Sequence, residues 1–143
     1  MISRERLTYP YMVLHRDMLN DFTSKVPDRI NILVEKGIKV PSKGDPLTRD
    51  FIQKSFATEI EEDDPCAVIV SAIGQWIIEN SHSMWTVGPI HSTELESVSG
   101  VGIETIKTRS FVPLSRMVKD TLSSPDMDSI GTLVAFSRVA TLE

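Results

Sequence analysis

The sequence predicts an all-α fold, a single-domain helical bundle of about seven helices around one buried central hydrophobic helix. First, the run from Cys66 to Ile78 is apolar apart from Ser71, Gly74 and Gln75, and a helix that is hydrophobic nearly all round belongs inside a domain. Second, the segments on both sides repeat apolar residues at helical spacing. Third, only short connections separate these segments. A chain of 143 residues is long enough for one core, so residues 1–143 are expected to form one domain.

The N-terminal half is predicted to contain three amphipathic helices. A first, over about residues 10–24, has one apolar stripe, formed by Tyr11, Leu14, Met18, Leu19 and Phe22. A second starts near Pro27 and ends before Gly37, which can adopt the left-handed C-terminal conformation. A third starts at Asp45-Pro46 and ends in the acidic run 59–64, which is expected to be a solvated turn. Its apolar side carries Leu47, Phe51, Ile52, Phe56 and Ile60.

The central helix has recognisable ends. Asp64 is a good N-cap, Pro65 sits where a first-turn proline loses no hydrogen bond, and Asn80 can close the C-terminus. The alternative is a buried strand, because Val68-Ile69-Val70 is β-branched. An apolar run of thirteen residues without a turn is long for a strand, and the sequence therefore favours a helix.

The C-terminal half is predicted to be helical after a loop over residues 81–89 that places Trp85 on the body. A fifth helix is capped by Ser92 or Thr93 and stopped by Gly100 and Gly102. A helical stripe then continues from 103 to 122, with a new helix or a bend at Pro113, and a last helix spans about 127–141. For residues 98–112 a hairpin is the alternative, because Val101, Ile103 and Val112 alternate with other residues.

Composition limits the classes of partner and compartment. The net charge of −5 and the pI near 5.2 disfavour non-specific attraction to nucleic acid or to acidic membranes. The single cysteine, Cys66, excludes an internal disulfide and fits a reducing compartment. No signal-peptide core and no run of about 18–20 apolar residues is present. We therefore expect a cytoplasmic protein without a membrane span, in the host cytoplasm if the protein is viral.

The sequence contains no recognisable catalytic or metal-binding motif. The three histidines, His15, His82 and His91, have neither HxxxH nor HxxxxH spacing. No nucleophile elbow, P-loop or dinucleotide fingerprint occurs. The prediction is no enzyme, no catalytic residues, no metal and no cofactor.

One segment resembles the helix-hairpin-helix motif of DNA-repair proteins. In Leu95–Ile106, Gly100 and Gly102 flank an apolar residue, and such a turn can bring backbone amides onto a phosphate. Glu94, Glu96 and Glu104 crowd this turn, whereas phosphate binding needs positive charge. Nucleic-acid binding is therefore an alternative function, and a helix break between packed helices explains the same glycines.

Two stretches resemble the Bcl-2 family of apoptosis regulators, in particular its divergent viral members. Phe56–Glu62, followed by the central helix, looks like the family's fourth helix leading into its buried fifth. Leu114–Val118, followed by Ile130–Phe136, looks like the same junction. The first is preferred, because it leaves room downstream for the remaining helices. Neither stretch has the family's Asn-Trp-Gly-Arg signature, whose arginine pairs with an aspartate of the ligand helix.

The resemblance implies a viral-type anti-apoptotic protein that sequesters the amphipathic helix of pro-apoptotic relatives in a hydrophobic groove. Arg49 or Lys54 could replace the absent arginine. The alternative within this family is an immune-signalling inhibitor without an open groove, and the same apolar surface could form a homodimer. The residues expected to line the groove are Leu33, Arg49, Phe51, Ile52, Phe56, Val68 and Ile69.

Overall fold

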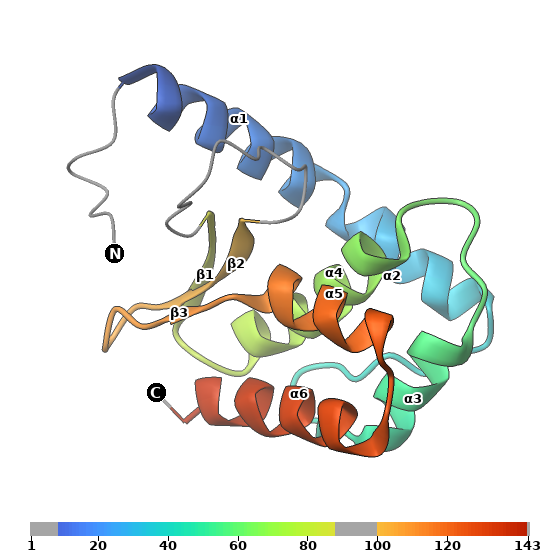
Figure 1. Cartoon of the computed structure of the whole chain (residues 1–143). Helices are drawn as coiled ribbons and strands as arrows, with labels where there is room; N and C mark the ends of the chain where they lie inside the picture. Colours follow the sequence, from blue (N-terminus) through green and yellow to red (C-terminus); the bar gives the residue numbers. More distant parts are fainter. Residues whose placement is uncertain (1–8, 88–99, 143) are drawn as a thin grey trace.

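The computed structural model describes residues 9–87 and 100–142. These residues form helices α1 to α6 and a three-stranded antiparallel sheet. Helix α4 lies in the middle, with α1 and α2 on one side and α5 and α6 on the other (Figure 1). The fold is therefore mixed α/β, and the predicted all-α, Bcl-2-like bundle of about seven helices is wrong.

Helix α4, Pro65–Glu79, confirms the predicted buried central helix. The Asp64 carboxylate accepts a hydrogen bond from the Cys66 amide at 3.0 Å, and Asn80 is the C-cap. All of α4 is buried except Pro65, Gln75, Ile78 and Glu79. Because burying one Val or Ile side chain contributes roughly 1.5–3 kcal/mol, this helix dominates the stability of the fold. The alternative strand over Val68–Val70 is wrong.

Helices α1, Tyr9–Ser24, and α2, Val26–Glu35, match the first two predicted helices. Gly37 follows α2 with φ 83°, the left-handed conformation expected after a helix C-terminus. Leu33 is fully buried, and α2 packs along α4.

Helix α3, Arg49–Ala57, is shorter than predicted at both ends. It does not start at Asp45-Pro46, because Thr48 is the N-cap and accepts a hydrogen bond from the Phe51 amide at 3.2 Å. Asp45 instead belongs to a turn. Its carboxylate accepts from the Ser42 amide at 3.1 Å, and its carbonyl accepts from the Trp76 indole of α4 at 2.8 Å. The acidic segment after α3 is a turn, as expected.

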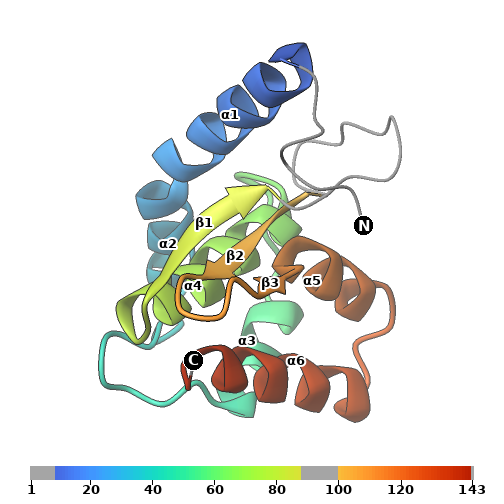
Figure 2. The ribbon, with the colours of Figure 1, turned by 90° about the vertical axis from the view of Figure 1, so that its left-hand side faces the viewer.

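The sheet consists of β1, Ser83–Val87, β2, Val101–Thr105, and β3, Phe111–Val112, in the order β1-β2-β3. Trp85 of β1 pairs with Ile103 of β2, which pairs with Val112 of β3. The sheet packs against α4, and Figure 2 shows β1 and β2 running across this helix.

The strands correct two helical or loop assignments. Residues 83–87 are not a loop, and residues 103–106 and 111 do not continue a helix. The hairpin alternative is right for residues 101–112. Gly102 lies within β2, so the helical turn required by a helix-hairpin-helix motif is not formed there. The predicted fifth helix, carrying Leu95 and Val98, lies outside the described residues.

The last two helices are α5, Leu114–Ser123, and α6, Met127–Ala140. Helix α5 begins directly after Pro113, in agreement with the new helix that was one of the two predictions for this proline. Helix α6 confirms the predicted last helix, with Asp126 as its N-cap. Among the helices of residues 9–87 and 100–142, none combines the length and the hydrophobicity that a membrane span requires.

Candidate protein-binding surface

The described residues contain no cluster of three or more His, Cys, Asp or Glu side chains able to hold a metal ion. Cys66 is buried in α4, and its Sγ lies 3.6 Å from the Ser115 carbonyl oxygen. Burial, together with the negative charge of Asp64, raises the pKa of this thiol to about 12. Because the thiolate is the reactive form, Cys66 is an inert core residue.

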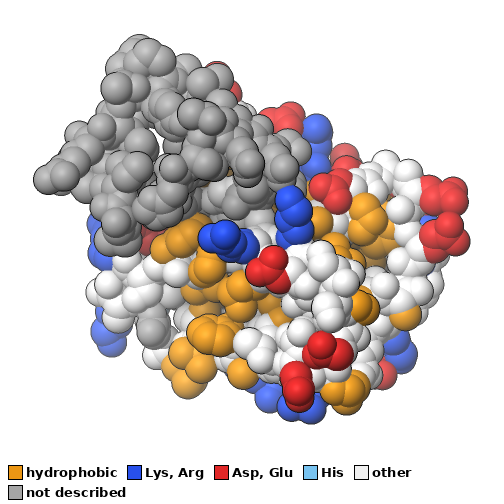
Figure 3. Space-filling view, in the orientation of Figure 1, with side chains coloured by type: hydrophobic (Ala, Val, Ile, Leu, Met, Phe, Trp, Pro, Cys, Tyr) orange, Lys and Arg blue, Asp and Glu red, His pale blue; other side chains and the backbone are white. Residues whose placement is uncertain are grey.

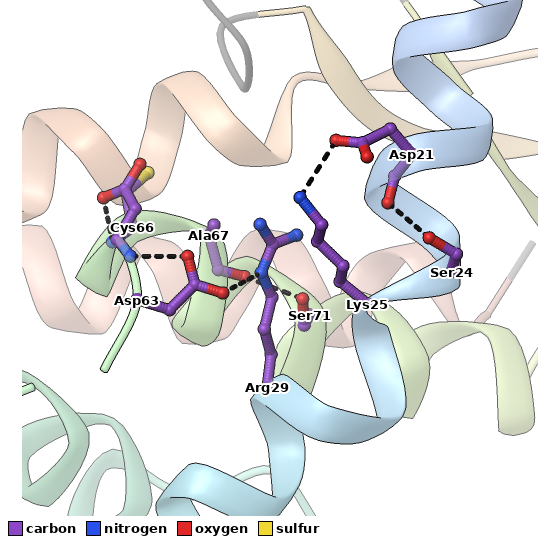
Figure 4. A network of polar contacts seen from close by, with 9 residues as sticks. Asp21, Ser24, Lys25, Arg29, Asp63, Cys66, Ala67 and Ser71 are labelled. Carbon is purple, nitrogen blue, oxygen red and sulfur yellow. Dashed lines mark hydrogen bonds and ion pairs between the residues drawn. The ribbon is translucent and has the colours of Figure 1, made fainter.

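A buried ion pair joins α2 to the turn before α4 (Figure 4). Arg29 has a side chain only 8% exposed, and its Nε donates to the Asp63 carboxylate at 2.8 Å. The guanidinium carbon lies 4.9 Å from the centre of the Phe22 ring of α1, a cation–π contact. The other Asp63 oxygen accepts from the Asp64 amide at 2.7 Å. This network fixes helix positions and presents no open site.

The Asp63 carboxylate makes stability depend on pH. Burial raises its pKa, but the hydrogen bonds from Arg29 and Asp64 and the Arg29 charge lower it to below its ordinary 3.8. A carboxylate with a lowered folded-state pKa stabilises the fold above its unfolded pKa, and loses that effect as the pH falls through the folded pKa.

Asp63→Asn should therefore be less stable than the parent chain near pH 6, and the difference should shrink below about pH 4. Urea unfolding measured between pH 6 and pH 3 tests this. A difference that stays constant across that range would show that the charge of Asp63 has no role.

The residues predicted to line a ligand groove lie mostly in the core. Of the seven, Phe56 is half-buried and Arg49 is exposed, and the other five are buried, namely Leu33, Phe51, Ile52, Val68 and Ile69. A helix lying on the surface of this structure reaches Arg49 and part of Phe56, but not the buried five. Arg49 extends toward α6, where a Cβ at Gly131 would lie 3.1 Å from its Nη2.

One hollow brings two of the predicted residues together. Its volume is about 230 Å³, and Phe51 and Lys54 both line it. Lys54 is 3.0 Å from the Asp50 carboxylate, so its charge already has a partner. The other lining residues are Ile38, Lys39, Pro41, Asp45, Pro46, Thr48 and Asp50.

A second hollow of about 300 Å³, here called the α5–α6 groove, lies between α5 and α6. Its lining includes the apolar side chains of Met117 and Leu133, which are half-buried and buried, and the exposed side chains of Asp120 and Asp128. The full lining is Met117, Asp120 and Thr121 of α5 with Asp128, Ser129, Thr132 and Leu133 of α6.

An exposed apolar strip on α6 and the turn that follows it continues the α5–α6 groove. Phe136 follows Thr132 by four residues and Leu133 by three, so it lies one helical turn further along the same side. Phe136, Val139 and Leu142 are 57%, 51% and 85% exposed, and the smaller Ala135 is exposed beside them. Figure 3 shows hydrophobic side chains gathered on this face, over β3 and the C-terminal half of α6.

Sequence reasoning missed this strip because it assigned α6 only one apolar face. The core face contains Ile130, Leu133, Val134 and Ala140. At 100° per residue, Ala135 and Val139 lie opposite this core face and Phe136 lies at its border, and Leu142 follows just beyond the end of α6. Two apolar sides on one short helix are the signal that could have identified it.

The chain was compared with family models, curated proteins and solved structures. No family model matches it, and no curated protein or solved structure shows significant similarity.

Proposed function

We propose that this chain is a protein-binding module that takes up an amphipathic helix of a partner along the α5–α6 groove and the exposed strip of α6. The observation that carries the proposal is the continuity of the two features. Lining residues from 128 to 133 are followed on the same helix by Phe136 and Val139, and just after the helix by Leu142. Large exposed apolar side chains that adjoin a hollow are typical of interaction surfaces.

The geometry fits a helix as the ligand. Helix α6 has 14 residues and is therefore about 21 Å long, at 1.5 Å per residue. The chain turns back after α5 through the short connection Ser124–Asp126, so that α6 lies beside α5 and the groove has two helical walls. An amphipathic helix of three to four turns can lay residues at i, i+3 or i+4, and i+7 along such a groove.

The helices of pro-apoptotic proteins are the first ligands to test. The resemblance to viral Bcl-2 relatives suggested them, and its second stretch, Leu114–Val118 with Ile130–Phe136, lies on α5 and α6. The proposal of a helix-binding function rests on the exposed face and not on a Bcl-2-like fold.

Phe136→Ser should weaken the binding of a fluorescent amphipathic-helix peptide by about tenfold, because the ring is the largest apolar side chain of the strip. Fluorescence anisotropy measures the affinity. Peptides from pro-apoptotic helices and a designed leucine-faced helix are the probes.

Val34→Ser is the matched control, because Val34 is also an exposed apolar residue, 52% exposed, but lies on α2. It should leave the affinity unchanged. Equal weakening by both substitutions, or binding of none of the peptides, would contradict the proposal. So would a homodimer in analytical ultracentrifugation that Phe136→Ser dissociates, since the face would then belong to a second copy.

A further inference from the structure

The end of the α5–α6 groove next to the connection Ser124–Asp126 is negatively charged. Asp120 of α5 and Asp128 of α6 line it from opposite walls, and both are exposed. Among the described residues, neither carboxylate has a hydrogen-bond or ion-pair partner. Asp126, in contrast, is occupied, because its carboxylate accepts from the Ser129 amide at 2.8 Å as the cap of α6.

One hydroxyl group at this end also presents an acceptor. Thr121 donates its hydroxyl hydrogen to the Met117 carbonyl at 2.8 Å, and Thr132 donates to the Asp128 carbonyl at 2.9 Å. With these hydrogens used inside the helices, the oxygen of the exposed Thr132 has only lone pairs to offer a ligand, whereas Thr121 is buried. Carboxylates and such an oxygen together favour a ligand group with several donors and a positive charge, which is a lysine ammonium or an arginine guanidinium.

We infer that the bound helix is basic at one end, and that a Lys or Arg at that end lies between Asp120 and Asp128 while its apolar residues contact Phe136 and Val139. This inference rests on the proposed function and adds the charge and direction of the ligand. The other end of the α5 wall carries the exposed Arg116, four residues before Asp120, so the two ends differ in charge.

The same charges argue against a second copy as the occupant. In a two-fold symmetric contact both copies contribute the same surface, so a second copy would add two more aspartates to the interface, and two chains that each have a net charge of −5 would be brought together. Like charges brought together in an interface are unfavourable. A basic partner segment avoids both effects.

The test uses two designed helical peptides with the same leucine face, one with two lysines and one with two glutamates at the same end. The lysine peptide should bind the parent chain at least tenfold more tightly at low salt, and 0.5 M NaCl should reduce this preference, because salt screens exposed charges. The variant D120K/D128K should reverse the preference. D120N/D128N should abolish it, and serves as the second variant because a lysine at 128 opposes the dipole of α6.

The control D17K/E59K reverses the same number of exposed charges on α1 and in the turn before α4, and should leave the preference unchanged. A nitroxide on the lysine end should broaden the amide signals of Ser124 and Asp126, on either side of Pro125. Equal loss in D17K/E59K, or broadening at Val139 instead, would overturn the inference. If Phe136→Ser abolishes binding while D120N/D128N changes nothing, the inference fails and the proposed function stands. If neither Phe136→Ser nor D120N/D128N changes the binding, both the inference and the proposed function fail.

Discussion

Replacing Gly102 by alanine should lower the free energy of unfolding by about 3 kcal/mol, the upper part of the range for overpacked sites. A Cβ at this position of β2 would collide with the Val112 carbonyl oxygen and lie 2.8 Å from Cε2 of the Phe111 ring. The carbonyl cannot yield easily, because it belongs to the backbone of β3. Strand β3 must therefore move away from β2.

This substitution also distinguishes a strand at residue 102 from the interior of a helix. If residue 102 lay in a helix, alanine would stabilise the chain by about 1 kcal/mol. Urea unfolding of Gly102→Ala gives the sign directly. Gly131→Ala is the matched control within α6, where the nearest atom is Nη2 of the flexible Arg49 side chain at 3.1 Å. It should be neutral or stabilising, and a destabilised Gly131→Ala with an unchanged Gly102→Ala would contradict the sheet.

Asp63→Ala should lower the free energy of unfolding by about 2 kcal/mol, less than the 3–5 kcal/mol typical of a fully buried pair, because solvent screens its partly exposed carboxylate. The Asp63 side chain is 29% exposed, whereas that of Arg29 is 8% exposed. Removing the carboxylate leaves the guanidinium buried without its ion-pair partner, and its Nη1 already lacks a hydrogen-bond acceptor among the described residues.

The double variant Asp63→Ala with Arg29→Met should recover part of this loss. Methionine keeps an unbranched side chain against Phe22 and removes the charge, and replacing both partners of a buried pair costs less than removing one. Thermal or urea unfolding of the parent, the two single variants and the double variant completes the cycle. A double variant less stable than Asp63→Ala would show that Arg29 contributes mainly through packing.

The helices whose ends are set locally could be predicted from the sequence. In α4, Asp64 and Pro65 adjoin the N-terminus that they define, and Asn80 directly follows the C-terminus. The start of α3 could not be predicted in this way. Asp45 and Thr48 are both good caps, and the choice involves Trp76, which donates to the Asp45 carbonyl from 31 residues away.

The sheet was predicted only in part, as the hairpin alternative for residues 98–112, because its strands show little alternation of buried and exposed residues. In β2 every residue but Glu104 is buried, so no polar face marks a period of two. Trp85 of β1 lies on Gly74 of α4, where a Cβ would collide with the ring. That contact explains why a glycine interrupts the apolar run, and it exists only after the strand and the helix have met.

The binding face shows a second limit of sequence patterns. An apolar stripe indicates that one face of a helix is shielded from water, but it does not indicate whether the domain itself or a partner shields that face. Ile52 and Val68 were predicted for a groove and belong to the core. Phe136 belongs to the second stretch that resembles the Bcl-2 family, but it was not predicted to be a ligand-binding residue. Its exposure depends on the rotation of α6 against α3 and α5.

The contact between Arg138 and Leu47 has a consequence for synthesis on the ribosome. Both Nε and Nη2 of this α6 residue donate to the Leu47 carbonyl, at 3.0 and 2.7 Å, across 91 positions of sequence. The connection before α3 is synthesised early, but its Leu47 carbonyl cannot be hydrogen-bonded in this way until Arg138 has been synthesised. Until α6 has been synthesised, the side of α4 that it covers stays exposed to solvent. A nascent chain at that stage would be a target for chaperones that bind hydrophobic helices.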